Sequence, residues 1–141
     1  MQVEIREIGP GDEAAFRPGC RGVFRRTGKP VAAHCLPCRT RSSPVRRLDG
    51  EVVGQCAAVI HRHPDKATEL YIDEVGVSPA FQRRGIARQM IERMVALGKT
   101  KGCEEVWVGT ERDNAAARGL YEALDLRGDE AENFVMYVYY L

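Results

Sequence analysis

The chain has 141 residues, of which 44% are hydrophobic and 29% are charged, as is ordinary for a soluble globular protein with one domain. No apolar run approaches the ~20 residues that a membrane-spanning helix needs, and the N-terminus lacks an apolar signal region. We therefore expect a cytoplasmic protein with no membrane partner. The five cysteines are an odd number, which favours free thiols over a disulfide framework.

The net charge of +1 conceals an uneven distribution. Residues 14–48 carry nine basic and no acidic side chains, so the other 106 residues have a net charge of −8. A basic block of this kind can bind nucleic acid. This block has only two aromatic residues, Phe16 and Phe24, and its four prolines break any recognition helix. We therefore predict no nucleic-acid partner.

Two short patterns offer metal ligands. Cys35 and Cys38 have CxxC spacing, but the chain has no second CxxC pair. His61 and His63 could bind a metal only if folding brought further ligands close to them. We predict no metal site from either pattern.

The first third of the chain shows little regular pattern. Val3 and Ile5 alternate with polar residues, with Ile8 as a further member, and predict a first strand, after which a helix should begin near Glu13. Residues 18–47 have neither helical nor strand periodicity, and we expect them to be irregular and loosely packed. Divergence, an unusual loop or a frame-shifted coding segment would each explain this atypical stretch.

From residue 51 onward the pattern is regular. Apolar alternation predicts strands, and apolar residues three or four apart predict helices. In chain order we expect a strand at 51–61, a strand at 69–77, a helix at 82–97, a buried strand at 105–109, a helix at 114–124 and a final strand at 133–141. Alternating strands and helices indicate an α/β (α+β) fold with a mixed sheet, and we expect residues 1–141 to form a single domain.

The most informative stretch joins the strand at 69–77 to the helix that follows it. The strand ends at Ser78-Pro79, and residues 82–87 (Gln-Arg-Arg-Gly-Ile-Ala) then open the helix. A helix N-terminus has unpaired backbone N–H groups and a partial positive charge, so it attracts anions. Gly85 would let a phosphate approach the backbone closely. An ordinary strand-to-helix turn with a solvated basic corner would have the same composition.

The surrounding sequence makes this pattern more specific. The Gln-x-x-Gly-x-Ala pattern of residues 82–87 follows a strand that ends in Val-Gly-Val, and it resembles the acetyl-CoA pyrophosphate loop of the GNAT superfamily of N-acetyltransferases. Downstream, the segment from Asn114 through Tyr121 to Leu124 resembles the superfamily's Asn-x-x-Ala-x-x-Leu-Tyr-x-x-Leu segment. The resemblance covers about residues 51–141. It implies the GNAT fold, in which a mixed, mostly antiparallel central sheet is flanked by helices and splayed where acetyl-CoA enters.

The resemblance also implies a site for acetyl-CoA. The loop would hold the pyrophosphate, the strand edge at 75–77 would pair with the pantetheine amides, and Asn114 would hydrogen-bond the pantetheine arm. Tyr121 would lie near the sulfur and protonate the leaving thiolate, although a role in helix packing would also explain it. The implied acetyl-CoA-binding residues are Val75, Gly76, Val77, Gln82, Arg83, Arg84, Gly85, Ile86, Ala87, Asn114 and Tyr121.

Carboxylates on the strand at 69–77 are the candidate bases. An amine must lose a proton before it can attack, and Glu74 is placed to accept that proton directly or through water. In a regular strand Asp73 would point to the opposite face, so only a bulge would bring both carboxylates to the active site. The candidate residues for binding a cationic acceptor are Asp73, Glu74, Asp129, Glu130 and Glu132, which could equally form a solvated face.

Within the superfamily, residues 69–75 (Glu-Leu-Tyr-Ile-Asp-Glu-Val), followed by residues 83–87 (Arg-Arg-Gly-Ile-Ala), look most like the aminoglycoside 3-N-acetyltransferases. We therefore expect an enzyme that transfers an acetyl group from acetyl-CoA directly to a primary amine of an aminoglycoside antibiotic or a similar polyamine. Two alternatives stay open, namely acetylation of a protein lysine or N-terminus, and a CoA-binding domain with impaired catalysis. The sequence also leaves the formation of a homodimer open.

Overall fold

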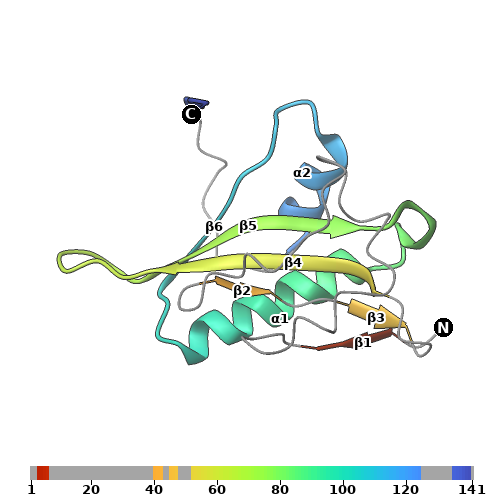
Figure 1. Ribbon diagram of the computed structural model, residues 1–141, viewed down its shortest axis with the longest axis horizontal. Coiled ribbons are helices and arrows are strands. Elements are labelled where there is room, and N and C mark those ends of the chain that lie inside the picture. The colour runs from red at the N-terminus through yellow and green to blue at the C-terminus, as the bar shows by residue number, and fades with distance from the viewer. Residues whose placement is uncertain (1–2, 7–39, 43–44, 48–51, 125–134, 141) are drawn as a thin grey trace.

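The computed structural model describes residues 3–6, 40–42, 45–47, 52–124 and 135–140. Six described strands form one sheet, and helices lie beside it (Figure 1). The strands are β1 (Val3–Ile5), β2 (Thr40–Ser42), β3 (Val45–Arg47), β4 (Val52–His61), β5 (Glu69–Val77) and β6 (Glu105–Val108). The helices are the short 3-10 helix η3 (Pro79–Phe81), α1 (Ile86–Thr100) and α2 (Ala115–Glu122).

The sheet is mixed, and most of its pairs are antiparallel. The strand order is β1-β3-β4-β5-β6, and β2 also pairs with β4. Only β5 and β6 run parallel, while every other described pair is antiparallel. The predicted mixed, mostly antiparallel sheet is therefore confirmed. The long hairpin of β4 and β5 runs through the molecule, and its turn projects from one end (Figure 1).

The core lies between α1 and the β4–β5 hairpin. Apolar residues recur at i and i+4 along α1, so one face of the helix can bury itself against the sheet. Alternate residues of β4 and β5 supply the other side of the core. The buried cluster comprises Val53, Cys56, Ala58, Leu70, Ile72, Phe81, Ile86, Met90, Ile91, Met94 and Val95.

Both ends of α1 differ from the predicted range of 82–97. The helix begins later because Arg83 and Gly85 have φ values of 60° and 74°, which a right-handed helix cannot contain. It continues to Thr100 and ends where Gly102, at φ 80°, reverses the backbone. The N–H of Cys103 then donates to the carbonyl of Gly98 at 3.0 Å, which is the bond of a glycine-capped helix end.

Part of the segment predicted to be irregular is ordered as strands. Residues 40–42 pair with β4 from Thr40↔Val59 onward, and residues 45–47 pair with both β1 and β4. The prediction was wrong for these residues, because backbone pairing along a strand edge does not require an apolar repeat. The rest of the segment, the predicted helix near Glu13, and Ile8 lie outside the described residues.

Two predictions about the other side of the sheet were wrong. The strand predicted to be buried, β6, is instead exposed, with 46% of Trp107 and 36% of Val106 accessible, because β6 pairs only with β5 among the described strands. The predicted final strand is not formed by the described residues 135–140. These residues are 63–93% exposed, and a strand needs a neighbour to accept its backbone hydrogen bonds.

The helices of the described part of the chain are η3, α1 and α2. None of them is both long and apolar enough to cross a membrane.

Candidate active site

The site begins where β5 and β6 separate. These parallel strands pair from Glu69↔Glu105 to Ile72↔Val108 and no further. Along residues 73–77, the edge of β5 that faces away from β4 has no strand partner in the described part of the chain. Its backbone N–H and C=O groups can therefore pair with an extended ligand, as the splay in the predicted fold requires.

A β-bulge interrupts β5 at the same point. Ala58 pairs with Ile72, whereas its neighbour Ala57 pairs with Glu74, so Asp73 is the extra residue. The regular alternation that would separate the two carboxylates is therefore absent.

The register shows on which face the carboxylates lie. Residues paired across an antiparallel ladder share a face, and Ile72 shares the α1-covered face with the buried Ala58. Glu74 is paired with Ala57 and lies on the opposite face, which Asp73 also occupies by alternation from Ile72. Both carboxylates are exposed and lie on the same face, so alternation does not select Glu74 over Asp73.

The loop between β5 and α1 is held in an unusual backbone conformation. Arg83 at φ 60° is the non-glycine residue with positive φ in the described chain, and Gly85 has φ 74°. Holding a non-glycine residue there costs on the order of 1–3 kcal/mol, and such strain is typical of ligand-binding loops. The Gln82 side chain donates from Nε2 to the Val77 carbonyl at 3.1 Å, which ties the loop to the end of β5.

This loop leads directly into the N-terminus of α1. The cap residue Gly85 has no side chain, and the first turn contains no acidic residue. The N–H groups of Ile86 and Ala87 lack intrahelical acceptors by helix geometry, and the helix dipole adds a partial positive charge. The structure thus provides a place where a phosphate could accept backbone hydrogen bonds.

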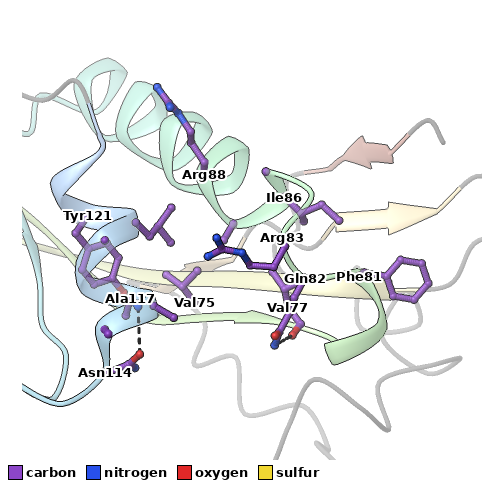
Figure 2. A pocket seen from close by; sticks show the side chains of 16 residues that line it. Val75, Val77, Phe81, Gln82, Arg83, Ile86, Arg88, Asn114, Ala117 and Tyr121 are labelled. Carbon is purple, nitrogen blue, oxygen red and sulfur yellow. Dashed lines mark hydrogen bonds between the residues drawn. The ribbon is translucent and has the colours of Figure 1, made fainter.

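A pocket of about 660 Å³ lies between this loop, the C-terminal half of β5 and α2. Figure 2 shows Arg83 reaching into the space beside Val75, with Tyr121 and Asn114 contributed by α2 and the residue before it. The pocket brings together these predicted acetyl-CoA-binding residues: Val75, Val77, Gln82, Arg83, Gly85, Ile86, Ala87, Asn114 and Tyr121.

Two predicted residues do not line this pocket. Gly76 is paired with Gln55 and, like Glu74, lies on the opposite face of the sheet from Val75. The guanidinium of Arg84 instead lies 5.5 Å from the centre of the Phe81 ring.

The structure adds pocket residues that the sequence prediction left out. They are Phe81, Arg88, Ala115, Ala116, Ala117, Gly119 and Leu120. The run of alanines opening α2 was a usable signal, because small side chains at a helix start leave room for a ligand to approach. Arg88 is also paired with Glu92 at 2.8 Å.

Asn114 has a structural role within the pocket. Its Oδ1 accepts a hydrogen bond from the N–H of Ala117 at 3.1 Å, which makes it the N-cap of α2 (Figure 2). The carbonyl oxygen is thus used by the fold, and the Nδ2 group is the part of this side chain that can donate to a ligand.

Tyr121 is half-buried on α2 and faces the pocket. Burial raises the pKa of its phenol above the ordinary value, and the nearby Cys56 and Glu111 raise it further. The hydroxyl is therefore protonated at neutral pH and can donate a proton.

The described part of the acidic set contains Asp73 and Glu74. The other members, Asp129, Glu130 and Glu132, lie outside the described residues.

Comparison with known proteins agrees with this geometry. The model of the Acetyltransferase (GNAT) family matches residues 14–125. The chain is 29% identical over 101 residues to an aminoglycoside N(6')-acetyltransferase type 1 of Salmonella typhimurium, and the aligned region covers 68% of each chain. It is 37% identical over 62 residues to the [ribosomal protein bS18]-alanine N-acetyltransferase of the same organism, and the aligned region covers 40% of this chain and 42% of that protein.

Solved structures show the same fold. AAC(6')-Iy, in complex with the bisubstrate analogue CoA-S-monomethyl-acetylneamine, superposes with a TM-score of 0.77 at 23% identity and covers all of both chains. The aminoglycoside acetyltransferase meta-AAC0020, from an uncultured soil metagenomic sample and in complex with sisomicin, has a TM-score of 0.77 at 18% identity, with 96% and 95% coverage. The predicted GNAT fold is therefore confirmed.

One finer prediction is corrected. The aminoglycoside N-acetyltransferase of Salmonella typhimurium and AAC(6')-Iy both act at the 6' position by name, whereas residues 69–75 and 83–87 were expected to resemble the 3-N-acetyltransferases. The expectation rested on two short segments, residues 69–75 and 83–87, whereas the family match extends over residues 14–125. With a family match over residues 14–125, a splayed sheet and a glycine-capped helix start beside the pocket, the chain belongs to the GNAT family of acetyl-CoA-dependent N-acetyltransferases.

Proposed function

We propose that this enzyme acetylates a primary amine of an aminoglycoside or a similar small polycation. The observation that carries the proposal is the pocket between the free edge of β5, the loop before α1 and α2, with exposed carboxylates at the adjoining bulge. The relative that covers 68% of the chain, an aminoglycoside N(6')-acetyltransferase, supports this acceptor class.

The described residues fit acetyl-CoA. The α1 start offers N–H groups to a pyrophosphate, and the basic side chain of Arg83 extends into the same pocket. The open edge of β5 at Val75 and Val77 offers backbone groups to an extended pantetheine arm. When bound, acetyl-CoA supplies a thioester whose acetyl group passes to the amine as the C–N bond forms and the C–S bond breaks.

A free N–H on that edge would also polarise the thioester carbonyl. A preorganised donor is worth most where negative charge develops, and the splay leaves this edge of β5 unpaired within the described chain.

In this proposal Tyr121 is the acid that protonates the leaving thiolate. The raised pKa of its phenol keeps the proton in place through neutral and mildly alkaline pH. The activity that depends on this proton is therefore fully present below the phenol's pKa and is lost as the pH rises through it.

We expect Tyr121→Phe to lower kcat about tenfold and to leave the affinity for acetyl-CoA nearly unchanged. The loss is moderate because water can also protonate a thiolate. Stopped-flow or steady-state thiol release gives kcat, and calorimetry gives affinity. A variant with wild-type kcat and an unchanged alkaline limb of the pH–rate profile would remove Tyr121 from the mechanism.

Glu74 is the proposed base for the amine, acting directly or through water. Its side chain is exposed at the bulge, on the sheet face opposite α1, so the acceptor would approach from that face. Asp73 lies on the same face and is the matched comparison.

We expect Glu74→Gln to lower turnover about tenfold, most strongly at low pH, where deprotonation of the amine limits the rate. Asp73→Asn should raise KM for a polycationic acceptor with less effect on kcat, because it removes attraction without removing the base. The measurement is a pH–rate profile for each variant. A larger kcat loss in Asp73→Asn than in Glu74→Gln would make Asp73 the base and Glu74 the residue that attracts the acceptor.

A second candidate is acetylation of a protein N-terminus or lysine. One observation favours it, namely the 37% identity to the ribosomal-protein alanine acetyltransferase over 62 residues. That match covers less of the chain than the aminoglycoside relative does, so we place it second.

A thiol-release assay separates the candidates. Purified full-length protein with acetyl-CoA would be offered aminoglycosides, linear polyamines, lysine peptides and peptides beginning with alanine. The proposal expects the highest kcat/KM with an aminoglycoside. Preference for a peptide would establish the second candidate, and CoA binding without any turnover would indicate a domain with impaired catalysis.

A further inference from the structure

A cluster of metal-ligating side chains lies at the end of β5 farthest from the acetyl-CoA pocket. His61 ends β4 and is directly paired with Glu69, the first residue of β5, while His63 follows in the turn between the strands. This turn projects from one end of the molecule, whereas α1 begins near the other end of the hairpin (Figure 1). The site is therefore separate from the acetyl-transfer site.

The three side chains converge on one point. His63 Nε2 lies 3.3 Å from Glu69 Oε2, and His61 Nδ1 lies 4.0 Å from the same oxygen. One donor atom from each of the three residues lies within 4.8 Å of the other two. The sequence alone made a metal site conditional on a further ligand, and Glu69 meets that condition.

Glu69 is held so that one oxygen faces the histidines. Its side chain is only 11% exposed, and Lys66 Nζ donates to the other oxygen, Oε1, at 2.6 Å. The Lys66 ammonium therefore occupies Oε1, and Oε2 is the oxygen that faces the histidines. A buried carboxylate with Oε2 turned toward two imidazoles is a suitable ligand arrangement.

The two imidazoles can complete a coordination sphere with little movement. Tetrahedral zinc with bonds of about 2.0–2.1 Å places its ligand atoms roughly 3.3 Å apart. The His63–Glu69 distance already has this value. His61 Nδ1 lies 4.0 Å from Glu69 Oε2 and must move closer, and its side chain is 46% exposed, so the ring has room to do so.

We propose that His61, His63 and Glu69 bind a divalent transition-metal ion, with Zn²⁺ as the best match to a His₂Glu donor set and water as the fourth ligand. His63 gives up its hydrogen bond to Glu69 and coordinates through the same nitrogen, as the carboxylate does through Oε2. The ion would link the last residue of β4 to the first residue of β5 and to the turn between them. No step of acetyl transfer depends on it.

The test is a titration of full-length, untagged, chelator-treated protein with Co²⁺, followed by its visible absorption and by competition with Zn²⁺. We expect one Co²⁺ per chain, displaced by Zn²⁺, and a metal-dependent rise in the thermal unfolding midpoint. His63→Gln and Glu69→Gln should each weaken binding at least tenfold. Acetyl-CoA affinity should be the same with and without metal, because the pocket lies at the other end of β5.

Two controls make the assignment specific. Lys66→Gln keeps all three ligands, leaves a neutral side chain that can still donate to Glu69 Oε1, and removes a competing positive charge, so metal binding should be retained or strengthened. Cys35→Ser/Cys38→Ser removes the CxxC pair and should leave the titration unchanged. If Glu69→Gln does not fold, which far-ultraviolet circular dichroism would reveal, His61→Gln alters the more exposed ligand and takes its place.

Three results would overturn the proposal. They are no saturable Co²⁺ binding, binding that survives both His63→Gln and Glu69→Gln, and binding lost in the cysteine variant with sulfur-to-cobalt charge-transfer absorption. In each case the cluster is an ordinary hydrogen-bonded ion pair at a strand end.

Discussion

Gly85→Asp is expected to weaken acetyl-CoA binding about a hundredfold, as measured by calorimetry. Two effects combine. The left-handed conformation at φ 74° costs a residue with a side chain about 1–2 kcal/mol. Asp at position 85 therefore favours a different loop conformation, which no longer presents the backbone N–H groups to the phosphates. Its carboxylate also places a negative charge at the α1 start, where the cofactor's phosphates would bind.

Steric collision with the protein is not the cause of this loss. Among the described residues, a Cβ at position 85 would meet only Gln89 Nε2, at 3.8 Å, which is ordinary contact. A negative charge is moreover favourable at a helix N-terminus, so the variant should fold, and its unfolding midpoint is the control for that.

Gly85→Asn separates the two effects. Asn has nearly the same shape, tolerates the left-handed region and carries no charge. We expect its loss of affinity to be tenfold or less, and to be insensitive to salt, whereas the loss in Gly85→Asp should shrink as ionic strength rises. Unchanged affinity in Gly85→Asp would remove the α1 start from the binding site.

The sequence was most informative where function depends on local chain geometry. The loop at 82–87 joins a strand to a helix, and both its glycine and its position before α1 could be read directly from neighbouring residues. The role of Asn114 as a helix cap likewise depends on local sequence, because asparagine directly before a helix is a common N-cap. These features need few long-range contacts, so the sequence specifies them strongly.

Features set by strand register could not be predicted in the same way. The bulge at Asp73 exists only because Ala57 and Ala58 pair with residues two apart on β5. Periodicity describes which face a residue takes within one regular strand, and a shift in pairing changes that face. The positions of Glu74 and Gly76 relative to the pocket depend on this shift.

Pairing across sequence distance also explains the metal-ligand cluster and the exposed edge strand. His61 and Glu69 come together through the β4–β5 register, and the sequence showed only the two histidines as a pattern. Trp107 and Val106 have the apolar character of buried residues, but burial requires a neighbour on both sides of β6.

Leu70→Ala is expected to lower the free energy of unfolding by about 2–5 kcal/mol. Leu70 is 2% exposed and lies in the cluster between α1 and the sheet, so removing its three outer carbons loses buried apolar contact and leaves a cavity. Urea unfolding would measure the effect as a lower midpoint with an unchanged slope. Val106→Ala, at a residue that is 36% exposed, should cost far less and is the control.

A substitution on α1 can partly fill the cavity left by Leu70→Ala, because Gly98 on α1 faces Leu70. A Cβ added to Gly98 would lie 2.8 Å from Leu70 Cδ2, a clash, but 3.5 Å from Leu70 Cβ, an ordinary contact that Leu70→Ala retains. Gly98→Ala should therefore stabilise the Leu70→Ala variant by about 1 kcal/mol, through helix propensity and partial filling. In the wild-type background the same change should give no gain or a loss, so the double-mutant cycle should show a coupling of about 1–3 kcal/mol. Additive effects would mean that Leu70 can move aside at no cost, and that α1 and β5 are less tightly packed than their distances indicate.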